Sequence, residues 1–145
     1  MSKLEPLMAS ARIFFTVGSL DYLQMGGRIG KVATAATGKL GVKPVIVMKD
    51  GDIGLGGIGR NRNKLKASVL QAAKKYLDEN GKDNFIVSVG YGYDKEEGFQ
   101  FMNEVESALD VKLNTETNVA IGIVSAVHTG PYPIGLGVIR KYETL

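Results

Sequence analysis

Arg28 follows a pair of glycines, Gly26 and Gly27, in the segment GGRIG. Glycine adopts backbone conformations that other residues avoid, so the pair predicts a tight turn that presents the arginine. Backbone N–H groups in a turn, together with a planar guanidinium, suit a carboxylate and a phosphate equally well. The segment therefore indicates either an anion site or simply a glycine turn with an exposed arginine.

Two more arginines, Arg60 and Arg62, stand just before a segment with helical spacing, residues 63–80. The N-terminus of a helix carries a partial positive charge and unpaired N–H groups, both of which favour anions. The alternative is a solvated basic stretch in which Asn63 caps the helix. Both interpretations remain open from spacing alone.

A third polar group, His128-Thr129-Gly130-Pro131, ends an apolar and β-branched stretch, which predicts that the imidazole and the hydroxyl lie at the end of an element. Ser125 is nearby in sequence. A hydrolytic triad would also need an orienting acid and an oxyanion hole, and neither is identifiable. We therefore predict no catalytic residue.

The segment GLGGIG, residues 54–59, matches the pattern G-x-G-x-x-G of dinucleotide-binding proteins. Asp78, the acid that such a site would need, falls inside the predicted helix at 63–80. The better interpretation is a glycine-rich loop that approaches a neighbouring backbone.

Composition narrows the remaining classes of function. The chain has 145 residues, a net charge of +3, no cysteine and one histidine. Disulfides, thiol catalysis and zinc held by cysteine are excluded, and we expect no metal and a reducing cytoplasm as the location. No apolar run approaches the roughly 20 residues that cross a bilayer. We expect one domain over residues 1–145, without a membrane span.

Strands and helices alternate along the chain, and together they must position these side chains. The expected strands are residues 13–17, 42–48, 85–89 and 134–139, and the expected helices are residues 3–11, 19–25, 31–40, 63–80 and 94–109. Asp50-Gly51 predicts a hairpin into a strand that begins at Asp52. The last helix should bury Phe99, Met102, Val105 and Leu109. These elements predict an α/β (α+β) fold, a two-layer mixed sheet with helices.

Taken in order, several motifs resemble the DegV family. They are LDYL with GGRIG, GVKPVI before Asp50-Gly51, Arg60 and Arg62 ahead of a helix, and HTGP followed by IGLG. The similarity runs from about Phe14 onward and corresponds to the C-terminal half of a DegV protein. It implies a missing N-terminal, Rossmann-like half that faces this one across a cleft.

Family members bind one long-chain fatty acid in that cleft, and the resemblance implies that a fatty acid kinase phosphorylates its carboxylate. The carrier itself would be non-catalytic, without a cofactor other than the bound lipid. The resemblance places Arg28, Arg60, Arg62, His128 and Thr129 at the head group or on the kinase-facing surface. It places Gly26, Gly27 and Gly130 in glycine turns at the cleft.

Two departures from the family bear on these expectations. The Ser/Thr groups that contact the carboxylate belong to the missing half, so we expect this chain alone to bind fatty acid weakly or not at all. Tyr132-Pro133 follows HTGP where the family usually has glycine, so the resemblance does not carry over the backbone geometry beside the ligand.

Two other classes of function stay open. One is a substrate-binding domain of a phosphotransferase that resembles dihydroxyacetone kinase, in which a histidine holds the ketone covalently; His128 is the candidate. The other is a regulatory domain that binds anions or nucleic acid, which rests on the pI of about 9.1 alone. Because no known nucleic-acid module is recognisable, we expect no nucleic-acid partner.

Overall fold

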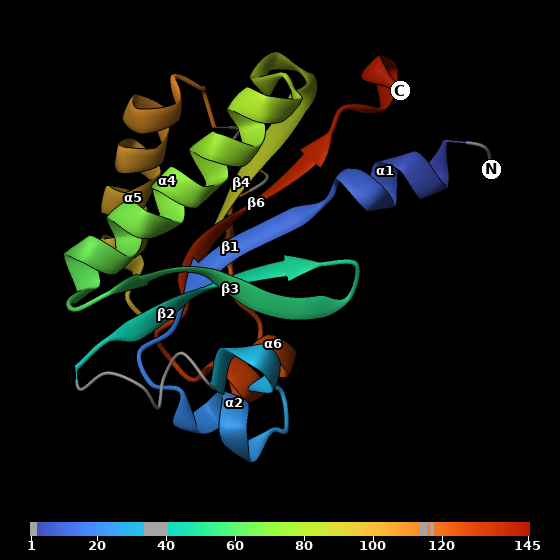
Figure 1. The fold of residues 1–145 in the computed structure, drawn as a ribbon. Coiled ribbons are helices and arrows are strands. Elements are labelled where there is room, and N and C mark those ends of the chain that lie inside the picture. Colours follow the sequence, from blue (N-terminus) through green and yellow to red (C-terminus); the bar gives the residue numbers. More distant parts are fainter. Residues whose placement is uncertain (1–2, 34–40, 114–115, 117) are drawn as a thin grey trace.

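A computed structural model describes residues 3–33, 41–113, 116 and 118–145. Its strands form one six-stranded sheet within these residues, in the order β3-β2-β1-β6-β4-β5 (Figure 1). The strands are β1 Arg12–Thr16, β2 Lys43–Lys49, β3 Asp52–Gly59, β4 Phe85–Tyr91, β5 Val119–Ala120 and β6 Ile134–Arg140. The pairing is antiparallel except between β4 and β5, which confirms the predicted mixed sheet with helices.

The α-helices are α1 Leu4–Ser10, α2 Asp21–Met25, α4 Arg62–Asn80, α5 Lys95–Leu109 and α6 Ile123–Thr129. Short 3₁₀ turns are η1 Gly30–Val32, η2 Lys82–Asn84 and η3 Tyr142–Thr144. The helix predicted at residues 31–40 falls largely outside the described residues. The stretch before His128, which is apolar and β-branched, contains the short strand β5 and then folds as helix α6.

The β2–β3 hairpin turns at Asp50-Gly51, as predicted. Both residues have a positive φ, 53° and 79°, which is the conformation of the two-residue turns that match the twist of a hairpin. The segment GLGGIG does not form a loop but lies in β3, so that prediction was wrong. Its last residue, Gly59, does approach another backbone, because a Cβ there would lie 2.9 Å from the amide nitrogen of Leu65.

Helices α4 and α5 cover one face of the sheet and form the main core with it (Figure 1). In α4 the buried apolar residues recur at every fourth position: Leu65, Val69, Ala73 and Leu77. In α5 the buried face is Gly98, Phe101, Val105 and Leu109. The prediction that Phe99 belongs to this face was wrong, since its side chain is 56% exposed. Gly98 decides the rotation of the helix, because a Cβ there would lie 2.9 Å from the Cβ of Tyr91.

Of the described helices, α2 and α6 lie against the other face of the sheet, at one end (Figure 1). A small second core forms there around Phe15, Leu23, Val32 and Ile46. Beyond it the face is apolar and open: Ile13, Met48 and Ile86 are 44%, 37% and 44% exposed. This face therefore offers an apolar surface to a ligand or a partner.

The cap of α4 allows a direct test of the structure. Asn61 caps the helix, and not Asn63 as in the alternative of a solvated basic stretch: the side-chain oxygen of Asn61 accepts a hydrogen bond from the Lys64 amide at 2.9 Å. We expect Asn61→Ala to lower the free energy of unfolding by about 1 kcal/mol. The control Asn63→Ala, inside the first turn, should leave the free energy of unfolding unchanged. Urea denaturation of both variants checks this, and equal losses would contradict it.

Candidate functional site

The glycine turn after α2 uses its backbone N–H groups internally. The amide of Gly26 donates to the carbonyl oxygen of Tyr22 at 3.0 Å, and the amide of Gly27 donates to that of Gln24 at 3.0 Å. The amide of Arg28 donates to the carbonyl oxygen of Leu23 at 2.7 Å. They close the C-terminal end of the helix, and Gly27 takes a φ of 65° to allow it. An anion here would therefore be bound by the guanidinium of Arg28 and not by these N–H groups.

Helix α6 ends in the same way and presents His128 and Thr129. The amide of Gly130, at a φ of 75°, donates to the carbonyl oxygen of Ala126 at 2.8 Å. The hydroxyl of Thr129 donates to the carbonyl oxygen of Ser125 at 3.1 Å, which leaves its oxygen able to accept. Nδ1 of His128 is buried and has no hydrogen-bond partner among the described residues. This nitrogen faces Gly26 of α2, so only the rest of the imidazole is open to a ligand.

Two glycines allow α2 and α6 to lie against each other, as Figure 1 shows. A Cβ at Gly26 would overlap Nδ1 of His128, and a Cβ at Gly130 would lie 2.5 Å from a ring carbon of Tyr22. Each glycine thus makes room for an aromatic ring of the other helix. The result is that Arg28 and His128, far apart in the sequence, come to one place.

A groove of about 420 Å³ lies at this place and is called the polar groove here. Its lining includes Gly27, Arg28, Asp52, Ser125, His128 and Thr129. Asp52 was predicted only as the start of a strand, and no pattern in the sequence pointed to it as a lining residue.

A second groove, of about 290 Å³, lies over the open face of the sheet and is called the apolar groove. Its lining includes Ile13, Val119, Ile121 and Pro133. Phe15, Met48, Ser125 and Thr129 line both grooves, so the two are continuous. An apolar channel that ends at a few polar groups suits a ligand with a charged head and a long apolar tail.

Arg60 and Arg62 lie outside these grooves. Arg60 is exposed and lines a separate groove of about 430 Å³ with Gly59 and Lys64. That Arg60 and Arg62 contact the head group or face the kinase stays a prediction.

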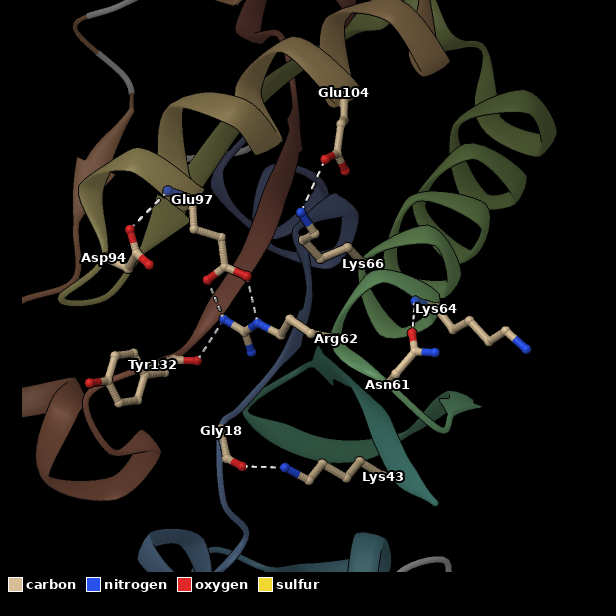
Figure 2. A network of polar contacts seen from close by, with 10 residues as sticks. All are labelled: Gly18, Lys43, Asn61, Arg62, Lys64, Lys66, Asp94, Glu97, Glu104 and Tyr132. Carbon is tan, nitrogen blue, oxygen red and sulfur yellow. Dashed lines mark hydrogen bonds and ion pairs between the residues drawn. The ribbon is translucent and has the colours of Figure 1, made fainter. Parts of the chain in front are cut away.

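The guanidinium of Arg62 is engaged within the fold (Figure 2). Its Nε and Nη2 each donate to the carboxylate of Glu97 at 2.7 Å, and Nη2 also donates to the carbonyl oxygen of Tyr132 at 3.0 Å. Arg62 thereby holds in position the segment that follows the HTGP motif and begins at Tyr132. No local pattern in the sequence predicts that Glu97 makes this contact.

Among the described residues no group of three or more His, Asp or Glu side chains is placed to hold a metal ion. None of the described helices is both long and apolar enough to cross a bilayer.

The chain matches known proteins over nearly its whole length. A family model described as an uncharacterised protein of the DegV family matches residues 1–141. A DegV domain-containing protein of Deinococcus radiodurans is 30% identical over 136 residues, which cover 92% of this chain and 46% of that protein. The chain thus spans about half the length of the curated relatives it matches.

Solved structures also match this chain over nearly its whole length. A stearic acid-binding protein from Eubacterium ventriosum is 92% identical, with a TM-score of 0.96, over all of this chain and 50% of that one. A DegV family protein from Thermus thermophilus, described by its fatty acid binding, is 27% identical with a TM-score of 0.81, over 97% of this chain and 49% of that one. By sequence and by fold, the chain belongs to the DegV family.

Proposed function

We propose that this chain is one half of a fatty-acid carrier, in which the polar groove receives the carboxylate and the apolar groove receives the acyl chain. The observation that carries the proposal is the continuity of the two grooves through Phe15, Met48, Ser125 and Thr129. The stearic acid-binding protein of 92% identity supports it and favours a long, saturated chain as the ligand.

Arg28 and His128 would hold the head group. The guanidinium offers two parallel donors to a carboxylate. A neutral imidazole carries one N–H, and because Nδ1 of His128 is buried against Gly26, the head group would be bound through Nε2. Thr129 lines the groove beside them, but its hydroxyl proton is already donated to the carbonyl oxygen of Ser125. This half thus contributes binding and orientation, and we assign it no catalytic residue.

The second half of the carrier is part of the proposal. Because the open face of the sheet leaves Ile13, Met48 and Ile86 partly exposed, an acyl chain lying there would keep one side in water. A facing domain would cover that side, and the burial of each methylene would add about 0.8 kcal/mol of affinity. We therefore expect this chain alone to bind fatty acid weakly.

The carrier would present its carboxylate to a fatty acid kinase in the cytoplasm. One carboxylate oxygen would attack the γ-phosphorus of ATP, with ADP as the leaving group, and the product would be an acyl phosphate. The kinase would supply the ATP site, and the carrier would supply the oriented acid.

The test uses a completed protein, in which this chain is joined to the half of the Eubacterium ventriosum protein that it does not span. Lipid extracted from the purified completed protein should contain about one fatty acid per chain, measured by mass spectrometry, and this chain alone should contain much less. With fatty acid kinase and ATP, hydroxylamine should trap an acyl hydroxamate. An empty completed protein that also fails to bind added stearate would overturn the proposal.

A further inference from the structure

Strand β6 is unusual in having no side chain at two positions that face the apolar groove. Ile134, Leu136 and Val138 are buried in the core with α4 and α5. Because side chains alternate along a strand, Gly135 and Gly137 face the opposite side, and both line the apolar groove.

The neighbouring strands continue this pattern. Gly135 lies between Phe15 of β1 and Gly90 of β4, and Gly137 lies between Ile13 and Ser88. All four neighbours line the apolar groove. The floor of the groove is therefore a furrow along β6, with large apolar side chains from β1 on one side and small residues from β4 on the other.

The packing requires glycine at one of these two positions but not at the other. A Cβ at Gly135 would overlap the carbonyl oxygen of Phe14 and lie 2.6 Å from Cα of Phe15, so the close approach of β1 requires it. A Cβ at Gly137 would have as its nearest neighbours the carbonyl oxygen of Arg12 at 3.9 Å and Cγ1 of Ile13 at 4.0 Å. Gly137 is also not among the glycines with a positive φ. The fold does not require glycine there.

Glycine inside a strand costs stability, and where the fold does not need it, it marks a place that something else approaches. We propose that Gly137 keeps the far end of the apolar groove open for the last carbons of the acyl chain and so sets the longest chain that fits. This inference rests on the proposed function and identifies the residue that determines chain length in its site.

The direction of the furrow supports this role. Ser125 and Thr129 join the apolar groove to the polar groove, and they precede the start of β6. Gly137 is two residues further along the strand than Gly135, about 7 Å more distant from that start. Two residues beyond Gly137, Ile139 pairs with Ile86, and neither lines the groove. Gly137 is thus the last residue of β6 that lines the apolar groove, and Ile139 lines another groove next to α1.

The test compares variants of the completed protein by competition of saturated fatty acids of 12 to 18 carbons against a fluorescent fatty acid. Gly137→Val should lower the affinity for the 18-carbon acid by about tenfold or more. The affinity for the 12-carbon acid should stay close to that of the unmodified protein. Gly137→Ala, which adds one methyl group where a Cβ fits, should give a smaller shift in the same direction and guards against misfolding of the valine variant.

Gly54→Val is the matched control. Gly54 lies in β3, has no heavy atom within 4 Å of a Cβ built on it, and lines neither groove. Its replacement should leave the preference for chain length unchanged. If both Gly137 variants keep the original preference, or lose affinity equally for every length, the inference is overturned while the proposed function stands. Failure of the unmodified completed protein to bind any of the acids would overturn both.

Discussion

Replacing Arg28 by methionine is expected to weaken stearate binding by the completed protein roughly 10- to 100-fold, because a charge-assisted hydrogen bond is lost. Arg28 lines the polar groove and is exposed. Among the described residues, its side chain donates only to the carbonyl oxygen of Gly26, at 3.1 Å. Most of its donors therefore remain available to a carboxylate. Fluorescence competition measures the affinity.

The stability of the Arg28→Met variant should stay within about 0.5 kcal/mol of the parent, since the side chain is on the surface. Arg60→Met is the matched control: Arg60 is also exposed, but it lines a separate groove. It should leave lipid affinity unchanged, and a loss of acyl-phosphate formation without a loss of affinity would favour a kinase-facing role. Unchanged affinity in Arg28→Met would contradict the placement of the head group.

The elements that the sequence predicted well are those with a strong local pattern. The long helix α4 repeats its apolar residues at every fourth position. The dipeptide Asp50-Gly51 strongly favours a two-residue hairpin turn, because both residues must adopt a positive φ. The face of α5 was ambiguous, because Phe99 and Phe101 are both apolar near the helical period. Contact between Gly98 and Tyr91 of β4 settled it, and that contact comes from tertiary packing.

The site was harder to predict for a related reason. Local spacing identified Arg28 and His128 separately, and only the family resemblance placed them together. Gly26 and Gly130 make the contact between α2 and α6, but each reads locally as an ordinary helix end. The pair Arg62–Glu97 joins the first turns of two helices that are distant in sequence. No local pattern predicts such a pair.

Replacing Glu97 by alanine is expected to lower the free energy of unfolding by about 2 kcal/mol. The carboxylate accepts two hydrogen bonds of 2.7 Å from Arg62, whose Nη1 is already buried without a partner among the described residues. The side chains of Arg62 and Glu97 are 28% and 19% exposed, so water reduces the cost below that of a fully buried pair. The amide of residue 97 keeps its bond to Asp94.

Urea denaturation measures this loss. Glu96→Ala is the matched control, because Glu96 is an exposed acid in the same first turn of α5; it should change stability by no more than about 0.5 kcal/mol. The double variant Arg62→Met/Glu97→Leu removes both charges and should recover part of the loss, since no buried charge is left alone. Equal losses for Glu96→Ala and Glu97→Ala would contradict the role of the pair.

Glu97→Ala should also weaken fatty acid binding, although Glu97 lines neither groove. Arg62 donates to the carbonyl oxygen of Tyr132, in the segment that leads from His128 and Thr129 to β6 (Figure 2). Without Glu97, the guanidinium is no longer held in that position, and the segment loses one of its anchors. The affinity of the completed protein for stearate should therefore fall in Glu97→Ala under conditions where it remains folded, but not in Glu96→Ala. A folded Glu97→Ala protein with full affinity would show that the remaining bonds, from Gly92 to Pro133 and from Tyr93 to Pro131, position the segment by themselves.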